Sequence, residues 1–266
     1  MRTVSQFGVD RRRSRIEGRD GRTLLLAIDH GLPAGPIPGI ERPAELLRRM
    51  RSVPFSGLVV NAGLVPCVSK DIPPEWGLVV HLSAGTLLGS RPASKVLSST
   101  VEQAISIGAD MVSIHVSFGA REEDRMIADA GRVTDAAQSF GVPVLIMAYA
   151  PAESGRSSDD AFAAAHAARA AAEIGASIIQ TNFAGSADGV RTIIRGCPVP
   201  VVMAGGPRTV SEDAFLESLR ESVRAGAAGI AVGRQVFQAP DPAAAAHRIA
   251  EVVFGSDRPI PLEAAR

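Results

Sequence analysis

Short apolar segments that recur along the chain constrain its fold more than any other feature of the sequence. They alternate with longer segments of helical periodicity, and each is too short and too continuous for an amphipathic helix. Continuous apolar runs of this kind are typical of parallel strands whose two faces are both covered by helices. We predict eight strands, at residues 24–29, 57–61, 78–83, 111–116, 142–149, 177–182, 199–206 and 229–234.

The segments between these strands carry helix signals. Ser211 and Asp241 precede helical patterns as N-cap residues, and the pair Gly175-Ala176 closes another before the next strand. Eight strands that alternate with helices predict an α/β fold, the (β/α)8 TIM barrel, as a single domain. An open doubly wound sheet is the alternative, but eight units favour closure. The clearest helices are expected at 93–107, 122–140, 158–174, 188–195, 211–225 and 242–254.

We divide the chain into a lead-in segment at 1–20, the barrel at 21–256 and a C-terminal tail at 257–266. The lead-in carries Arg11, Arg12 and Arg13 with little apolar periodicity. We therefore predict that this segment is a solvated arm. The alternative is a segment that covers the barrel floor or contacts another subunit.

Composition narrows the function classes. The chain has 28 basic and 28 acidic residues, so neither nucleic acid nor an anionic membrane is expected as its main partner. No apolar run approaches the ~20 residues of a membrane span, and we predict a cytoplasmic protein. Cys67 and Cys197 lack metal-ligand spacing, so neither a metal nor another cofactor is expected. Lys70 and Lys95 are the only lysines, and amine chemistry has few candidates.

Polar residues at the carboxyl ends of barrel strands are the first place to look for chemistry. Asp29 follows the first strand and can act as a general acid or base, although an aspartate before a glycine loop also caps backbone N–H groups. Tyr149, the only tyrosine, ends the fifth strand and can relay a proton or hold a substrate hydroxyl. His81 and His115 end neighbouring strands; with Asp29 they imitate a metal site, but hydrogen-bonded histidines are favoured.

Glycines after the seventh and eighth strands predict an anion site. Gly205, Gly206 and Gly233 let backbone N–H groups approach a ligand, and Arg234 supplies a planar donor. Tight corners alone also explain such glycines. Because both pairs fall at the loops where barrels commonly hold phosphate, we predict a phosphorylated small-molecule substrate.

The chain resembles the DhnA-type class I aldolases, which include the archaeal-type fructose-bisphosphate aldolases and 2-amino-3,7-dideoxy-D-threo-hept-6-ulosonate synthases. The resemblance extends from about residue 24 to 254 and is carried by the stretches at 27–31, 81–86, 109–116, 202–207 and 227–234. It implies proton transfer by Asp29 and Tyr149, and a homo-oligomer. It also implies phosphate binding at Gly205, Gly206, Gly233 and Arg234; His30 and Ser83, which lie in the matching stretches, are expected to contact substrate.

One part of the pattern departs from that family. The family's Schiff-base lysine lies on the sixth strand in Lys-Thr-x-Tyr-Thr-Gly-Asp, whereas this chain reads Gln180-Thr-Asn-Phe-Ala-Gly-Ser186. The family's Pro-Arg-Gly after the tyrosine is likewise replaced, at 150–153. An amide forms no iminium, and losing that electron sink costs roughly 5 kcal/mol in transition-state stabilisation. We therefore expect Gln180 and Asn182 to donate hydrogen bonds to a developing enolate oxygen instead.

Several functions remain open at this point. The first is a diverged aldolase-family lyase, synthase or isomerase that acts on a phosphorylated keto-sugar or amino-sugar-like compound. The second is a metal-dependent lyase that uses Asp29, His81 and His115. The third is a catalytically inactive phosphate-ligand-binding subunit. Lys70 or Lys95 is a possible replacement for the missing amine, but both are expected to be solvated, with Lys95 at the rim where a helix begins.

Overall fold

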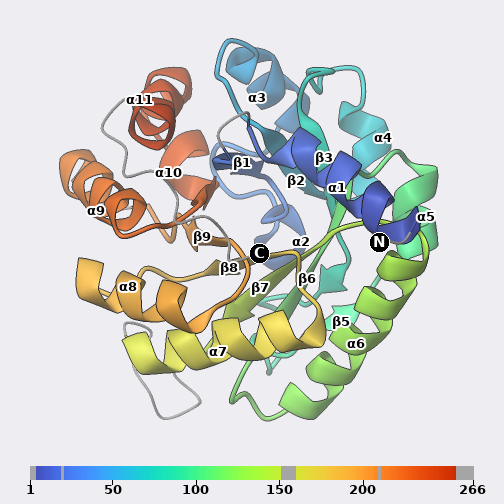
Figure 1. The fold of residues 1–266 in the computed structure, drawn as a ribbon. Helices are drawn as coiled ribbons and strands as arrows, with labels where there is room; N and C mark the ends of the chain where they lie inside the picture. The colour runs from blue at the N-terminus through green and yellow to red at the C-terminus, as the bar shows by residue number, and fades with distance from the viewer. Residues whose placement is uncertain (1–3, 19–20, 151–159, 209–210, 256–266) are drawn as a thin grey trace.

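The structure, a computed structural model, describes residues 4–18, 21–150, 160–208 and 211–255. Eight parallel strands close into a barrel in the order β1-β10-β9-β8-β7-β6-β3-β2 (Figure 1), which confirms the predicted (β/α)8 fold. Each strand lies within two residues of its predicted ends. Their bounds are β1 Thr23–Ala27, β2 Gly57–Asn61, β3 Gly77–His81, β6 Met111–Ser117, β7 Val144–Tyr149, β8 Ile178–Thr181, β9 Val201–Ala204 and β10 Gly229–Val232.

The first and last strands pair in register, with Leu24 opposite Ile230, and this pairing closes the barrel. Side chains alternate between two cores. Leu25 and Ala27 point into the barrel, where they join an inner cluster, whereas Leu24 and Leu26 pack outward against the helices. Both cores are mainly apolar, and Ser113 of β6 is a fully buried polar residue among them.

Helices surround the strands (Figure 1), and several start at the predicted caps. Ser211 and Asp241, the predicted caps, accept hydrogen bonds from the first turns of α9 and α11, and Asp160, which was not predicted as a cap, does the same for α7. Gly175 ends α7 with φ 113°, a conformation that favours glycine. The longer helices are α1 Val4–Ile16, α3 Pro43–Met50, α6 Glu123–Ser139, α7 Ala161–Ile174, α8 Ala187–Gly196, α9 Glu212–Arg224 and α11 Pro242–Phe254; the shorter are α2 Gly31–Ala34, η1 Ala62–Leu64, α4 Val65–Val68, α5 Val101–Ser106 and α10 Arg234–Phe237.

Residues 4–16 form helix α1, and the prediction of a solvated arm is wrong. Ile16 is fully buried in the inner cluster at the amino-terminal end of the barrel. A side chain at Gly77 would collide with Ile16, so this glycine makes room for the plug. Arg15 pairs with Asp110 at 2.8 Å and fixes the helix to the barrel wall. Helix α1 is anchored by the burial of a single residue, Ile16. Because one buried residue produces no apolar periodicity, the sequence did not predict this contact.

The predicted helix at 93–107 is also wrong in its first half. Residues 83–84 (β4, Ser83–Ala84) pair antiparallel with residues 96–97 (β5, Val96–Leu97) and form a hairpin above β3. Helix α5 begins later, where the Thr100 side chain accepts a hydrogen bond from Gln103 N–H. The hairpin satisfies backbone groups at 96–97 through a partner that is distant in sequence, so local propensity did not reveal it.

No helix within the described ranges has the length and apolar content that crossing a membrane requires. The tail at 257–266 and the departure at 151–153 lie outside the described residues.

Candidate active site

A cavity of about 460 Å³ occupies the mouth formed by the carboxyl ends of the strands. It is the place that the barrel topology assigns to chemistry. Every site residue predicted from the sequence lines it. The predicted residues are Asp29, His30, Ser83, Tyr149, Gln180, Asn182, Gly205, Gly206, Gly233 and Arg234.

Asp29 and His30 follow β1 and stand at one side of the mouth. His30 Nδ1 lies 3.5 Å from Asp29 Oδ1, and the imidazole packs edge-on against Phe237. Burial lowers the pKa of His30; the Asp29 carboxylate opposes that effect and the Arg234 cation adds to it. Asp29 is therefore flanked by a largely neutral imidazole and keeps its lone pairs available to the cavity.

The glycine loops after β9 and β10 form an anion-sized corner. Gly206 has φ 66°, which favours glycine, and a Cβ at Gly233 would lie 2.5 Å from His30 Cε1 and 2.7 Å from the Ala27 carbonyl. Arg234 extends along this corner, and its Nε is buried without a hydrogen-bond partner in the described part of the chain. A buried guanidinium nitrogen without a partner is costly, and an anionic ligand would satisfy it.

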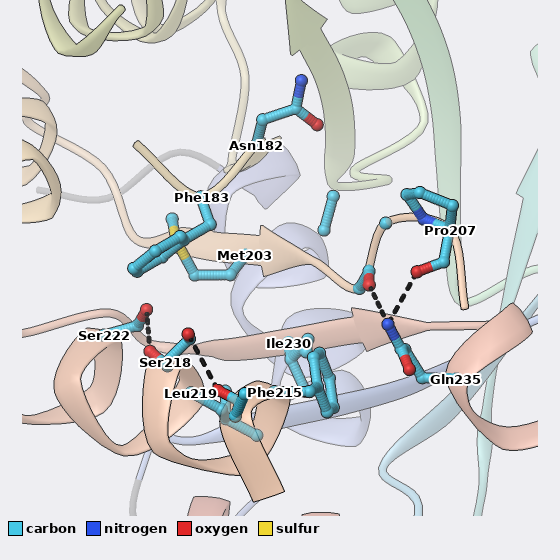
Figure 2. A pocket seen from close by; sticks show the side chains of 14 residues that line it. Asn182, Phe183, Met203, Pro207, Phe215, Ser218, Leu219, Ser222, Ile230 and Gln235 are labelled. Carbon is cyan, nitrogen blue, oxygen red and sulfur yellow. Dashed lines mark hydrogen bonds between the residues drawn. The ribbon is translucent and has the colours of Figure 1, made fainter. Parts of the chain in front are cut away.

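Gln235, which sequence reasoning missed, fixes the loop after β9. Its Nε2 donates to the carbonyls of Gly205 at 3.2 Å and Pro207 at 2.7 Å, as Figure 2 shows. Arg208 in turn donates to the Gln235 carbonyl at 2.7 Å. The sequence shows only that Gln235 follows Arg234, the candidate phosphate ligand. Its contact with the loop after β9 becomes evident only when β9 and β10 are known to be neighbours.

A second, apolar pocket of about 550 Å³ opens beside the glycine loop, between the barrel wall and α9 (Figure 2). Phe183, Phe215 and Leu219 are among the apolar residues that line it, and Asn182 lines both this pocket and the mouth. The two cavities share residues 204–207. Phe183 is one of the positions where the sequence departs from the family pattern, and here it lines this pocket.

Tyr149 and Gln180 form a hydrogen-bonded pair across neighbouring strands. Gln180 Nε2 donates to the Tyr149 hydroxyl at 2.8 Å, and the buried Oε1 of the same amide has no partner among the described residues. Burial raises the pKa of Tyr149, the Asp29 charge raises it further, and the Gln180 bond and Arg234 oppose the shift. The phenol therefore stays protonated.

The two barrel histidines are paired with serines, as the favoured interpretation predicted. His81 Nδ1 lies 2.9 Å from Ser113 Oγ, and His115 Nε2 lies 2.9 Å from Ser117 Oγ. Burial lowers the pKa of both rings, for His115 to about 3. In the described ranges no group of three His, Cys, Asp or Glu side chains is arranged to hold a metal ion, which removes the ligand set of the metal-dependent alternative.

Lys95 also lines the mouth, and the prediction that it is a solvated residue at the start of a helix is wrong. It lies on the hairpin just before β5 and is partly buried. Ser83, on the other arm of the hairpin, accepts the His115 backbone N–H at 3.0 Å, so its hydroxyl is already engaged in holding the hairpin to β6. Lys70, in contrast, is exposed and lies outside the cavity lining.

Comparisons with known proteins point to one family. The model of the DeoC/LacD family aldolases matches residues 23–239. A 2-amino-4,5-dihydroxy-6-oxo-7-(phosphonooxy)heptanoate synthase of Streptomyces griseus is 35% identical over 96% of this chain and 94% of its own. A 2-amino-3,7-dideoxy-D-threo-hept-6-ulosonate synthase of Archaeoglobus fulgidus is 35% identical over 94% and 92%. An archaeal fructose-1,6-bisphosphate aldolase, solved with its catalytic lysine bound to a carbinolamine intermediate, superposes with a TM-score of 0.86 at 30% identity and covers 93% of this chain and 100% of its own.

Proposed function

The chain belongs to the DeoC/LacD family of aldolases, and from this premise we propose that it makes or breaks a carbon–carbon bond in a phosphorylated keto compound. The observation that carries the proposal is the composition of the mouth. A buried Arg234 nitrogen that has no partner among the described residues lies in the same cavity as Asp29 and the Tyr149–Gln180 pair. Anion binding and proton transfer thus meet in one cavity.

The substrate class follows from that corner and from the relatives. The product of the Streptomyces griseus synthase carries a keto group next to a phosphorylated terminal carbon and a hydroxyl on the other side. In such a compound, the bond between the two hydroxylated carbons is the one that an aldol reaction forms. The smallest fragment with this pattern is dihydroxyacetone phosphate, which we propose as the minimal ligand of the mouth.

Each residue then has a role. Gly205, Gly206, Gly233 and Arg234 hold the phosphate through backbone N–H groups and the guanidinium. Asp29 takes the proton from the carbon next to the keto group. Tyr149, which is protonated, exchanges a proton with the developing oxyanion or the product hydroxyl.

The amides of Gln180 on β8 and of Asn182, which follows β8, line the cavity where this reaction takes place. Gln180 Nε2 holds the Tyr149 hydroxyl, so it positions the phenol. We propose that Gln180 stands where relatives carry the Schiff-base lysine. The reaction then proceeds without an iminium at that position, and the amides stabilise the enolate oxygen through hydrogen bonds. His30 and Ser83 complete the wall around the substrate.

Calorimetry with dihydroxyacetone phosphate tests the binding half of this proposal. Arg234→Ala is expected to weaken affinity about 10- to 100-fold, because a charge-assisted hydrogen bond contributes about 1.5–3 kcal/mol. Arg220→Ala on the exposed face of α9 is the matched control and should leave affinity unchanged. Equal affinity in native protein and Arg234→Ala would contradict the assignment of the phosphate corner.

The remaining alternative is an inactive subunit that binds the same ligand. It predicts binding without turnover and no effect of Asp29→Asn on function. The proposed enzyme predicts that Asp29→Asn keeps the ligand but loses turnover by about 10²–10⁴-fold. We further propose that the protein acts in the cytoplasm and that it forms a homo-oligomer. Sedimentation analysis tests the oligomeric state.

A further inference from the structure

The chain holds only two lysines, and the structure separates them. Lys95 lines the mouth cavity, whereas Lys70 is exposed and outside it. No amine is therefore available from β8, where position 180 is a glutamine, but one is supplied from the hairpin above β3. The proposed function does not yet use this amine.

The hairpin holds the Lys95 side chain over the cavity. Across the hairpin, a Cβ at Gly85 would lie 2.9 Å from Lys95 Cδ and 3.2 Å from Nζ, so a residue without a side chain leaves the space that the lysine fills. Lys95 Nζ donates to the Pro92 carbonyl at 2.7 Å, and Ser117 Oγ on β6 donates to the Ala93 carbonyl at 2.9 Å. The strand that carries His115 thus fixes the loop that carries the lysine.

The surroundings of Lys95 favour a neutral amine. No carboxylate forms an ion pair with Lys95 within the described ranges, and the nearby rings of His81 and His115 are neutral. Burial lowers the pKa of Lys95 from its usual range. Partial burial therefore favours the neutral form of Lys95, the form in which an amine attacks a carbonyl carbon.

We propose that Lys95 supplies, from the hairpin, the amine that forms an iminium with the keto group of the bound phosphorylated substrate. The inference rests on the proposed function, because it needs the keto carbon to lie in the mouth. It assigns covalent chemistry to a residue outside β8, while Tyr149 and Asp29 keep their roles in proton transfer. The amides of Gln180 and Asn182 then contact the carbonyl and carbinolamine oxygen before it leaves, in place of an enolate oxygen.

The atoms and charges of the step balance. The Nζ lone pair forms the N–C bond while the carbonyl π pair moves onto oxygen, which takes the proton lost by nitrogen. A second proton, from Tyr149, lets that oxygen leave as water, and nitrogen becomes the cation of a C=N bond. Asp29 then removes the proton of the adjacent carbon, and its electron pair forms the C=C bond of a neutral enamine. The enamine carbon adds to the aldehyde carbon, whose oxygen takes the proton held by Asp29, and nitrogen again becomes the cation of a C=N bond. Water then adds to that carbon, the keto group forms again as the amine leaves, and the proton that is released returns to the Tyr149 phenolate.

Reductive trapping tests the proposal. Native protein, Lys95→Arg and Lys70→Arg are each incubated with dihydroxyacetone phosphate and sodium borohydride, and the adduct is located by peptide mass analysis. We expect an adduct at position 95 in the native protein and in Lys70→Arg, and none in Lys95→Arg. Lys95→Arg keeps the positive charge, so a catalytic loss on the order of 10⁴-fold in this variant would separate amine chemistry from simple charge stabilisation.

The outcomes distinguish this inference from the proposed function. An adduct on Lys70, or no native adduct while calorimetry shows dihydroxyacetone phosphate bound, would overturn the role of Lys95 and leave the proposed function standing. Absence of binding would overturn both. The site of the adduct is determined in the native protein itself. The role of Lys95 can therefore be tested even if a variant misfolds. Gln180→Lys serves as the positive control: trapping at position 180 without native trapping also counts against Lys95.

Discussion

Replacing Tyr149 by phenylalanine removes the hydroxyl that accepts the Gln180 amide at 2.8 Å. Gln180 Oε1 already lacks a partner, so the variant leaves both polar ends of a 6% exposed side chain unpaired. An unpaired buried polar group costs about 1–3 kcal/mol. Gln180→Leu removes the amide instead, and the Tyr149 hydroxyl turns towards water in the mouth, so we expect a loss below about 1 kcal/mol.

The double variant removes both partners and should be less destabilised than the sum of the single variants by about 1 kcal/mol or more. Urea unfolding of the four proteins measures this coupling. Tyr149→Phe combined with Phe7→Ala on exposed α1 is the control and should be additive. Additivity of Tyr149→Phe and Gln180→Leu within about 0.3 kcal/mol would refute the hydrogen bond as a stabilising contact.

Three further perturbations test other parts of the account. Ile16→Ala leaves a cavity at the barrel floor and should lower the free energy of unfolding, measured in urea, by about 2–5 kcal/mol. Phe7→Ala, at an exposed position, should change it little, and equal effects of the two substitutions would contradict the role of Ile16 as a plug. Gly233→Ala should abolish dihydroxyacetone phosphate binding in calorimetry with the fold retained by circular dichroism, because its Cβ would lie 2.5 Å from His30 Cε1, while Gly63→Ala meets open space and should bind normally. The pKa of His115 is about 3 in the folded protein and about 6.5 in the unfolded chain, so below pH 6.5 the unfolded chain takes up a proton that the native state does not. The free energy of unfolding should therefore fall by at most about 2 kcal/mol by pH 5. His115→Gln should lose this part of the pH dependence.

The strands of the barrel were predictable because both of their faces are buried. Leu24, Leu25 and Leu26 are all apolar, although alternate side chains point into different cores. The resulting continuous apolar run can be recognised in the sequence without any knowledge of the tertiary structure. The strand-end rule then located the mouth residues, since eight parallel strands bring eight chain positions to one edge.

The parts that sequence analysis missed depend on contacts between distant segments. Ile16 plugs the barrel only because Gly57 and Gly77 leave space for it. Lys95 reaches the cavity because residues 83–84 pair with residues 96–97, a pairing that helical periodicity at 93–107 concealed. Gln235 stabilises a loop that precedes it by 28 to 30 residues. None of these contacts changes the local pattern of polar and apolar residues.

Hydrogen exchange on dihydroxyacetone phosphate in deuterated water tests the central claim most directly. Proton magnetic resonance follows the hydrogens of its hydroxymethyl carbon, and the assay needs no knowledge of the aldehyde partner. If the mouth is an aldolase-type site, the native protein will exchange one of these hydrogens, and Asp29→Asn will slow the exchange at least about 10²-fold. Arg234→Ala will slow the exchange about 10- to 100-fold at subsaturating ligand, because it weakens phosphate binding. Bound ligand with no exchange above the rate in buffer, or exchange that Asp29→Asn leaves unchanged, would contradict the account.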